Sequence, residues 1–327
     1  MKRLAYAAQA LAIALALMSA QTPAARAAQD DTLQIGLVGA ISMTHWPLLI
    51  GLKKGYYADA HLKLELIHTQ SSGAVLQQLA AGSIEATVSA ALIEPIYAIS
   101  KGAPIRLVRL EIQLPPYAIE AKPQYKKLEE LSGKTIMIDA PTGITKIYAE
   151  RMLVPHHVAP STVDYVYAGA TGARFNALMS GAIDATILLP PFSFSAEDKG
   201  YNNLGLVADY ANDLPFTGAA VNTNWASKNP DALRRFLDAH NKSVRWFLDP
   251  KNRQESIDIM VEASKLSPEV IGKTYDFLRS RPFFESSGRI SKSKMEALLA
   301  AVRQLGESKG STNVADYVLP GIAQLGD

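Results

Sequence analysis

The sequence predicts an α/β protein of two similar lobes, each a mostly parallel sheet flanked by helices. Short apolar segments alternate with segments of helical periodicity, which is typical of parallel α/β sheets. In addition, a stretch that begins at residue 72 recurs 99 residues further along the chain. The length of 327 residues allows about two domains. These observations together predict two similar lobes in one chain.

The recurring stretch comprises residues 72–87 and 171–186, with the sequences SGAVLQQLAAGSIEAT and TGARFNALMSGAIDAT. Seven of the sixteen aligned positions are identical, whereas ordinary residue usage would give about one. Ser72/Thr171 and Glu85/Asp184 are conservative pairs. We interpret the stretch as a duplication. Two unrelated helix–turn–strand units that share turn chemistry are the alternative.

Each copy is expected to form a helix, a turn and a strand. We expect the hydroxyl groups of Ser72 and Thr171 to cap free N–H groups of the helices. The helices are expected to end at Gly82 and Gly181, where a left-handed residue needs no side chain. Strands are predicted after the helices at 84–89 and 183–189, and before the copies at 33–38 and 134–139.

The order of these elements divides the chain between the lobes. Lobe one is expected to take residues 32–114 and 214–327, and lobe two residues 115–213, so that two strands cross between them. After residue 214 only 218–221 looks extended, so this segment is expected to pack onto lobe one. Its helices are predicted at Pro230–Leu248, Arg253–Ser264, Pro268–Arg279 and Ser291–Ser308.

Residues 1–27 have the pattern of a secretory signal peptide. Lys2 and Arg3 precede an apolar stretch over residues 4–18, and Ala25-Arg26-Ala27 forms a small-x-small cleavage site. The apolar run is shorter than the ~20 residues that span a bilayer, which disfavours the alternative of an uncleaved anchor. We therefore expect the remaining chain to be released into the periplasm.

Composition excludes several classes of function. Hydrophobic residues make up 48% of the chain and charged residues 20%. Subtracting the three cations of residues 1–27 from the 33 basic residues leaves one base fewer than the 31 acids, so no nucleic-acid partner is expected. The chain contains no cysteine, which excludes disulfides, thiolate metal sites and thiol catalysis.

The sequence also contains no standard catalytic motif. The nucleophile elbow, the phosphate-binding loop and the zinc-protease His-Glu-x-x-His helix are all missing. The adjacent His156 and His157 diverge on a helix or strand, so we predict a surface loop rather than a metal site. We expect no enzyme, no metal and no cofactor. A secreted enzyme with a scattered catalytic triad is an alternative.

Several short motifs, taken in order, resemble one family. They are GLKKGYYAD at 51–59, AGSIEA at 81–86, KGAPIR at 101–106, LEELSGKTI at 128–136, SGAIDA at 180–185 and NPDALRRF at 229–236. With them the chain resembles the periplasmic solute-binding proteins of ABC importers. The matching branch takes aliphatic sulfonates, taurine, nitrate and thiamine-pyrimidine precursors. Eukaryotic relatives that synthesise a pyrimidine use a cysteine-rich motif, which this sequence lacks.

The resemblance implies a type II periplasmic-binding-protein fold with the solute held between two lobes. Hinge closure around the solute would present both lobes to the membrane permease and ATPase of an ABC importer. We expect the protein to be a monomer. A sensor that presents its closed form to a receptor would share this binding chemistry and is the alternative.

Candidate solute contacts lie in loops that leave the carboxyl ends of strands and open helices. Helix N-termini there offer free N–H donors, which suits an anion such as a sulfonate or carboxylate. A nitrate-like anion, an aromatic carboxylate and a pyrimidine also remain open. The lobe-one candidates are Ser42, Met43, Thr44, His45, Trp46, Ser71, Ser72, Gly73, Ser89 and Ala90. The lobe-two candidates are Thr142, Gly143, Thr145, Thr171, Gly172, Pro190 and Pro191.

Some candidates have two interpretations. Trp46 is either a stacking platform for the solute or a core residue, and His45 forms a hydrogen bond either with the solute or with nearby backbone.

The charged candidates also have two interpretations. Glu94 either binds an ammonium group of the solute or simply begins a helix. Arg109 and Arg174 either reach an anion or are solvated at the surface. The crossovers add the weaker candidates Glu111, Phe216 and Thr217.

Overall fold

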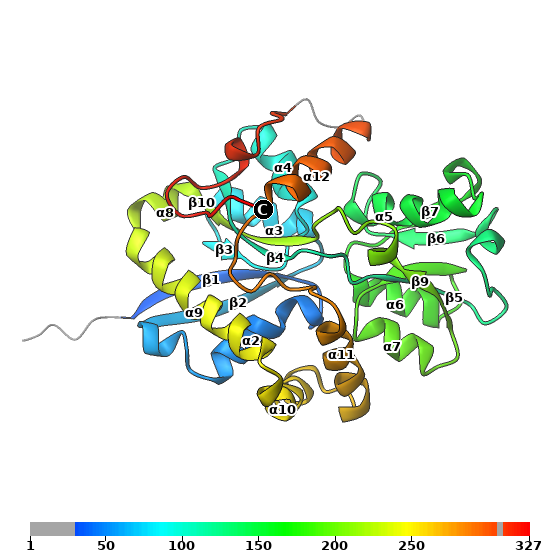
Figure 1. The fold of residues 1–327 in the computed structure, drawn as a ribbon, viewed down its shortest axis with the longest axis horizontal. Coiled ribbons are helices and arrows are strands. Elements are labelled where there is room, and N and C mark those ends of the chain that lie inside the picture. The colour runs from blue at the N-terminus through cyan, green and yellow to red at the C-terminus, as the bar shows by residue number, and fades with distance from the viewer. Residues whose placement is uncertain (1–29, 306–309) are drawn as a thin grey trace, which may run out of the picture.

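The computed structural model describes residues 30–305 and 310–327, and the predicted leader lies outside them. The strands form two five-stranded sheets, one in each half of Figure 1. The lobe-one strands are β1 (Asp31–Val38), β2 (Leu62–Thr69), β3 (Ala86–Thr87), β4 (Ile105–Ile112) and β10 (Thr217–Asn222). The lobe-two strands are β5 (Ala118–Ala121), β6 (Thr135–Ile138), β7 (Asp164–Tyr167), β8 (Ala185–Leu188) and β9 (Asn202–Leu206).

The two sheets have the same topology. Their strand orders are β2-β1-β3-β10-β4 and β7-β6-β8-β5-β9. In the first sheet, β1 pairs in parallel with β2 and β3, and β10 is antiparallel to β3 and β4. In the second, β6 pairs in parallel with β7 and β8, and β5 is antiparallel to β8 and β9. Each lobe therefore receives its antiparallel strand from a chain segment that has just crossed from the other lobe.

Helices pack on both sheets, and the C-terminal helices largely follow the predicted bounds. The helices before β10 are α2 (Trp46–Lys53), α3 (Ser72–Ala81), α4 (Ile93–Ser100), α5 (Ile144–Leu153), α6 (Thr171–Met179) and α7 (Phe192–Glu197). Those after it are α8 (Thr223–Lys228), α9 (Pro230–Leu248), α10 (Arg253–Ser264), α11 (Pro268–Ser280) and α12 (Lys292–Gln304). The predicted bounds of α9 and α10 are confirmed, and α12 ends four residues earlier than predicted.

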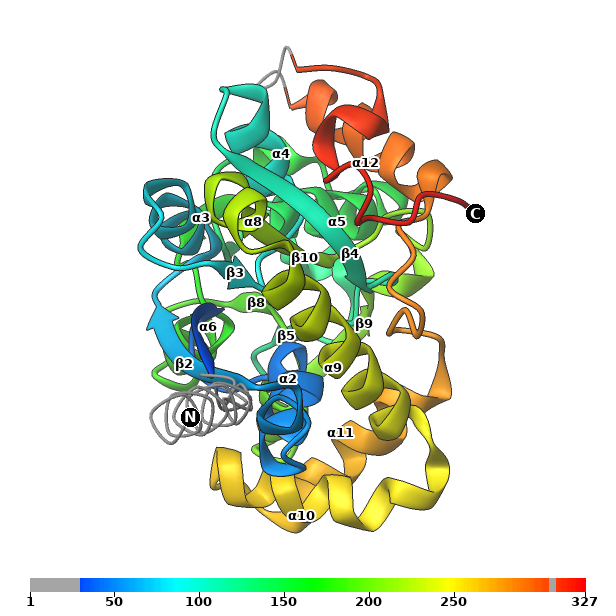
Figure 2. The same ribbon diagram turned by 90° about the vertical axis from the view of Figure 1, so that its left-hand side faces the viewer.

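The C-terminal segment packs against lobe one, as Figure 2 shows for α9. Leu233 and Phe236 of α9 belong to the same buried cluster as Leu33 and Ile35 of β1. The extended stretch near residue 218 is β10, which lies inside the lobe-one sheet. The helix α9 buries its apolar stripe on the sheet because its leucine and phenylalanine side chains recur at helical spacing.

The duplicated stretches adopt the same conformation in both lobes. Gly82 and Gly181 both have φ of +75°, the left-handed value expected after each helix. The predicted capping by Ser72 and Thr171 is wrong, because each is the first residue inside its helix. The N-cap of α3 is Ser71, whose Oγ accepts from Ala74 N at 3.2 Å.

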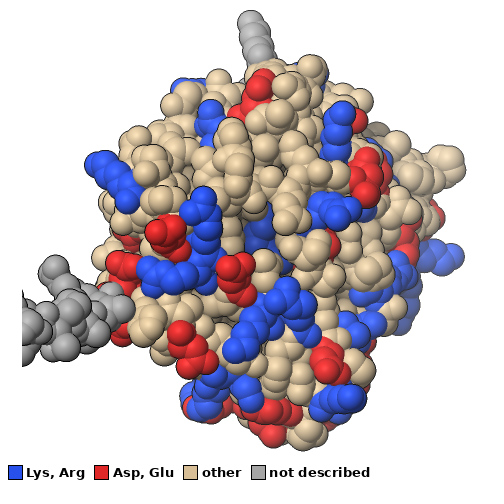
Figure 3. All heavy atoms as spheres, turned by 60° about the vertical axis from the view of Figure 1, so that its left-hand side comes forward, with Lys and Arg blue, Asp and Glu red and all other residues tan. Residues whose placement is uncertain are grey.

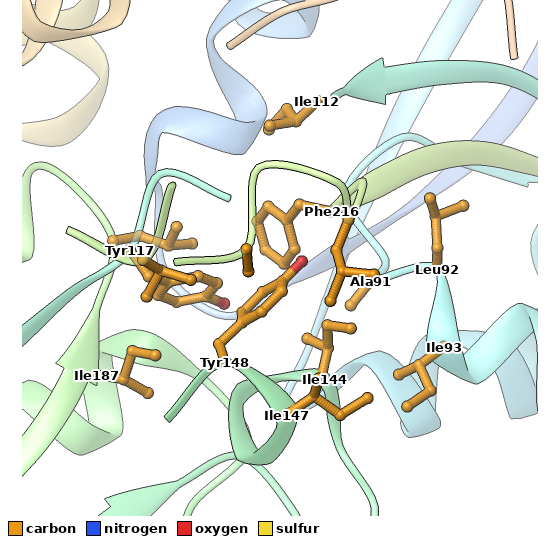
Figure 4. Close-up of a cluster of buried hydrophobic side chains, with 14 of the residues drawn as sticks. Ala91, Leu92, Ile93, Ile112, Tyr117, Ile144, Ile147, Tyr148, Ile187 and Phe216 are labelled. Carbon is orange, nitrogen blue, oxygen red and sulfur yellow. The ribbon is translucent and has the colours of Figure 1, made fainter. Parts of the chain in front are cut away.

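Aromatic side chains pack around the two crossovers, which run between β4 and β5 and between β9 and β10. In Figure 4, Tyr117, Tyr148 and Phe216 lie together at this point. The ring centroids of Tyr117 and Phe216 are 4.9 Å apart, in an edge-to-face arrangement. Tyr148 Oη of α5 donates to Pro215 O at 3.0 Å. Helix α5 therefore contacts both crossovers.

Charges of both signs lie interspersed on the face of the molecule in Figure 3. Lys53 pairs with Glu262 at 2.8 Å and Lys54 with Glu255 at 2.6 Å, which links α2 to α10. Such exposed pairs contribute about 0–1 kcal/mol each. Across residues 30–305 and 310–327, no helix has the length and hydropathy of a membrane span.

Candidate functional site

Two adjoining hollows lie between the lobes. The outer hollow has a volume of about 320 Å³ and is lined by Ser71, Ser72, Gly73, Glu94, Tyr97, Asp139, Ala140, Thr142, Gly143 and Gly169. The inner hollow has a volume of about 30 Å³ and is lined by Val38, Ser42, Thr44, Ser72, Ser89, Ala91, Tyr117, Asp139, Gly169, Thr171, Leu189 and Phe216. Three residues line both. Each lobe contributes to both hollows, so the space is an interlobe cleft.

The lobes are in contact around this cleft. Met43 N of lobe one donates to Pro190 O of lobe two at 3.1 Å. A Cβ placed on Gly169 would lie 2.6 Å from Ser71 Cβ, closer than real Cβ atoms approach one another. Glycine at position 169 therefore allows the two lobes to meet.

Two hydroxyl groups from the duplicated stretches line the inner hollow in equivalent ways. Ser72 Oγ accepts from Ala91 N at 3.3 Å, and Thr171 Oγ1 accepts from Leu189 N at 3.2 Å. In each lobe the hydroxyl ties the start of a helix to the loop after the next strand. A hydroxyl that accepts in this way keeps its own hydrogen to donate. The two lobes can therefore each offer a donor to a bound solute.

The remaining wall of the inner hollow is polar on lobe one and aromatic at the crossovers. Ser42 Oγ and Thr44 Oγ1 are 3.0 Å apart, and Ser89 Oγ accepts from Val38 N at 3.1 Å. Burial raises the pKa of the Tyr117 phenol, so this side chain stays neutral. Tyr117 and Phe216 supply the apolar surface.

Two carboxylates line the outer hollow. Asp139 Oδ1 accepts from Thr145 Oγ1 at 2.6 Å and from Ala140 N at 2.8 Å. Burial raises the pKa of Asp139 above its ordinary value. Glu94 lies in the first turn of α4, and its Oε2 is buried without a hydrogen-bond partner. Burial, and then the charge of Asp139, raise the pKa of Glu94 well above its ordinary value.

Arg174 is buried beside the cleft, with 1% of its surface exposed. Its Nη1 donates to Ala168 O at 3.0 Å and to Gly169 O at 2.7 Å, and its Nε donates to Ile187 O at 3.1 Å. The side chain thus holds the loop that carries Gly169. The expectation of surface solvation for Arg174 is wrong, because these backbone carbonyls bind the buried guanidinium.

Half of the predicted contact residues line the hollows. They are Ser42, Thr44, Ser71, Ser72, Gly73, Ser89, Thr142, Gly143, Thr171 and Phe216. The other half lie outside the lining. They are Met43, His45, Trp46, Ala90, Glu111, Thr145, Gly172, Pro190, Pro191 and Thr217.

Trp46 and His45, the two candidates with ring side chains in the loop after β1, are buried in lobe one. Trp46 is fully buried, 5.9 Å from the ring of Phe247 in an edge-to-face contact. His45 Nδ1 accepts from Ser42 N at 3.2 Å. Burial lowers the pKa of His45 to about 3, so the ring is neutral. Neither residue lines the hollows, because Trp46 packs on Phe247 and His45 bonds the backbone of its own loop.

Glu111 belongs to a buried polar network in lobe one. Its Oε1 lies 3.0 Å from Arg109 Nε and its Oε2 lies 3.1 Å from His240 Nε2. Tyr57 Oη and His240 Nδ1 are 2.8 Å apart. The network connects β4 with α9, so neither Glu111 nor Arg109 reaches the cleft.

The other candidates outside the lining support the loops. Thr145 orients Asp139 through the bond to Oδ1, and its Oγ1 also accepts from Asp139 N at 2.8 Å. Pro190 supplies the carbonyl of the interlobe bond, and Gly172 packs near the ring of Phe192. Thr217 is buried at the start of β10.

Asp139, Tyr117 and Gly169 are among the lining residues that were not predicted from the sequence. Asp139 ends the predicted strand 134–139, and a carboxylate at the carboxyl end of a parallel strand is a recognisable signal. Gly169 precedes the second copy of the duplication by two residues. The orientation of Tyr117 depends on how the crossovers pack, which no local pattern indicates.

Comparison with known proteins gives a family and a fold. A family model described as NMT1/THI5 like matches residues 42–253. No curated protein sequence matches the chain. The alkanesulfonate-binding protein SsuA from Xanthomonas axonopodis pv. citri, bound to MOPS, has a TM-score of 0.73 at 19% identity. That alignment covers 90% of this chain and 99% of SsuA.

Two further structures have the same architecture. The nitrate-binding protein NrtA from Synechocystis PCC 6803 has a TM-score of 0.73 at 17% identity, over 88% of this chain and 84% of NrtA. The ligand-binding component of an ABC-type import system from Staphylococcus aureus, with zinc bound, has a TM-score of 0.76 at 18% identity, over 90% of this chain and 98% of that one. These likenesses show the fold, so the predicted two-lobed fold is confirmed.

Proposed function

Because the chain belongs to the NMT1/THI5-like family, we propose that it is the solute-binding component of an ABC importer. The observation that carries this proposal is the cleft that both lobes line with equivalent hydroxyl groups, Ser72 and Thr171. A solute that bonds both groups would hold the lobes together. Closure of this kind is a common response of two-lobed proteins to their ligands.

The outer hollow, at about 320 Å³, is within the range of small-molecule sites. The first turns of α3 and α6 lie at the cleft, and the partial positive charge of a helix N-terminus favours an acidic group. We propose a small solute with an acidic group such as a sulfonate or carboxylate at this end. Micromolar affinity would correspond to about −8 kcal/mol.

The closed protein would then deliver the solute to a membrane permease and its ATPase. This role requires the chain in the periplasm, which the leader pattern of residues 1–27 supports. Each solute molecule would be bound by one copy of the chain, because one chain supplies both walls of the cleft.

A thermal-shift panel tests the proposal. The panel contains taurine, isethionate, nitrate, benzoate and 4-aminopyrimidine. A ligand present at a hundred times its Kd adds about 2.7 kcal/mol of stability. We expect at least one member to raise the Tm, and Ser72→Ala with Thr171→Ala to weaken that rise. Ser100→Ala and Ser180→Ala, which remove exposed hydroxyl groups outside the lining, are the matched controls.

The same samples distinguish binding from catalysis. Mass spectrometry of the bound solute after long incubation is expected to return it unchanged. Chemical conversion of the solute, lost in the Ser72→Ala variant, would instead indicate an enzyme.

A further inference from the structure

The outer hollow is acidic. Glu94 and Asp139 line it, and within the described part of the chain no Lys or Arg lines either hollow. The nearby Arg174 donates to three backbone carbonyl groups and does not line the cleft. A solute in this space therefore meets two carboxyl groups and no cation in the lining, although the charge of the buried Arg174 partly offsets the effect of burial on the pKa of Asp139.

The Asp139 carboxyl group is held in a fixed position. Thr145 Oγ1 and Ala140 N both donate to its Oδ1. A Cβ on Gly143 would overlap this carboxyl group, so the glycine leaves the space that it needs. A carboxyl group that two hydrogen bonds hold in this way is preorganised to bind a donor.

Glu94 has less support, from a hydrogen bond with its own backbone N–H. Its Oε2 is buried and has no hydrogen-bond partner. A buried acceptor without a partner destabilises the protein until a donor reaches it. Burial and the neighbouring charge of Asp139 raise the pKa of Glu94, which means that a second negative charge beside Asp139 is disfavoured. A positively charged donor would reverse both effects.

We propose, on the basis of the solute-binding function above, that the solute carries a basic nitrogen that donates to Glu94 and Asp139. The nitrogen belongs to a protonated amine or to an amidine-type group, both of which present N–H donors and positive charge to paired carboxylates. The acidic or acceptor end of the solute then faces Ser72 and Thr171. Simple anions such as nitrate, which have no donor nitrogen, leave Glu94 without a partner.

Matched pairs of probes test this inference. Taurine is compared with isethionate, benzamidine with benzamide, and 4-aminopyrimidine with 4-methylpyrimidine. Within each pair only the first member carries an amine or amidine group; benzamide keeps N–H donors but its nitrogen is not basic. Thermal shift and calorimetric titration are run on the wild-type protein and on Glu94→Gln, Asp139→Asn and the control Glu296→Gln, which changes an exposed carboxylate of α12.

We expect at least one nitrogen-bearing probe to bind and its matched partner to bind at least tenfold more weakly. Glu94→Gln and Asp139→Asn are each expected to weaken the nitrogen-bearing probe by about 10- to 100-fold, and Glu296→Gln to leave it unchanged. If Asp139→Asn fails to fold, Glu94→Gln carries the test, because Glu94 Oε2 has no partner to lose.

Two results would overturn the inference in different ways. If isethionate, benzamide or 4-methylpyrimidine binds as tightly as its partner, or if Glu94→Gln leaves binding unchanged, the basic nitrogen is wrong and the solute-binding function stands. If the wild-type protein binds no member of the panel, both proposals fail.

Discussion

Gly169 of lobe two lies directly against Ser71 of lobe one, so closely that a methyl group on the glycine would lie 2.6 Å from Ser71 Cβ. The carbonyl oxygen of Gln70 would be 3.0 Å from the same methyl group. Ser71 caps α3, and Gly169 follows β7 in the loop that Arg174 holds. The two loops therefore meet at the cleft through a contact that only glycine permits.

Gly169→Ala is expected to keep the lobes from closing fully. The added methyl group clashes across the cleft, and both neighbouring loops are restrained by hydrogen bonds. We expect solute affinity to fall at least tenfold while the Tm of the free protein changes little. Small-angle X-ray scattering with solute is expected to show a larger radius of gyration than for the wild type. Gly272→Ala in α11, whose added methyl group would have no neighbour closer than 3.9 Å, is the control.

Glu120→Gln is expected to change how stability depends on pH. Glu120 is fully buried in β5 with neither oxygen partnered, and burial, with a smaller effect of Glu197, raises its pKa to about 9 from an ordinary 4.5. As pH rises above about 4.5, the unfolded chain releases this proton while the folded chain keeps it. Stability from this group is therefore complete below about pH 4.5 and declines as pH rises toward 9.

Denaturant unfolding at pH 5 and pH 8 measures this effect. Relative to the wild type, Glu120→Gln is expected to gain about 3–4 kcal/mol between the two pH values, because glutamine has no proton to lose. Glu296→Gln, at an exposed position, is expected to show no such gain. An equal pH dependence in the wild type and Glu120→Gln would show that the buried carboxyl group is not the cause.

Tyr148→Phe is expected to loosen the crossovers. The variant removes the donor to Pro215 O and leaves that carbonyl oxygen without its partner, at a cost of about 1–2 kcal/mol in the free energy of unfolding. Tyr167→Phe, at a half-exposed position of β7, is expected to cost much less. Urea unfolding compares the two variants, and equal stabilities would contradict the structural role of Tyr148.

Glu111→Gln is expected to separate stability from binding. The change disrupts the buried contacts with Arg109 and His240, and breaking a buried ion pair costs about 3–5 kcal/mol. Because the network lies outside the cleft, the Kd for the solute is expected to stay within about twofold when measured below the Tm of the variant. A tenfold loss of affinity in folded Glu111→Gln would contradict this prediction and show that Glu111 contributes to solute binding.

The sequence was informative where local chemistry determines the structure. Gly82 and Gly181 indicated the ends of both repeated helices because a left-handed residue favours glycine. The bounds of α9 followed from Pro230 at its start and from the helical spacing of its apolar residues. The repeat also indicated that Ser72 and Thr171 occupy equivalent positions.

The sequence was less informative where packing between distant segments decides. Trp46 and Glu111 were both compatible with a solute contact, and only the position of α9 and Phe247 shows what they pack against. The sequence predicts that the Ser72 hydroxyl accepts from an N–H group of its own helix. In the structure it accepts from Ala91 N, which lies after the next strand and therefore far along the chain. The order of the strands in each sheet, and the antiparallel pairing of β10 with its neighbours, could be determined only from the structure.

The most direct test of the account is a crystal structure of the protein with the tightest-binding member of the panel. We predict that this molecule lies between the lobes and accepts hydrogen bonds from both Ser72 Oγ and Thr171 Oγ1. Binding to one lobe alone would contradict the account. So would binding in the separate cavity of about 260 Å³ beside Arg109 and Asn241.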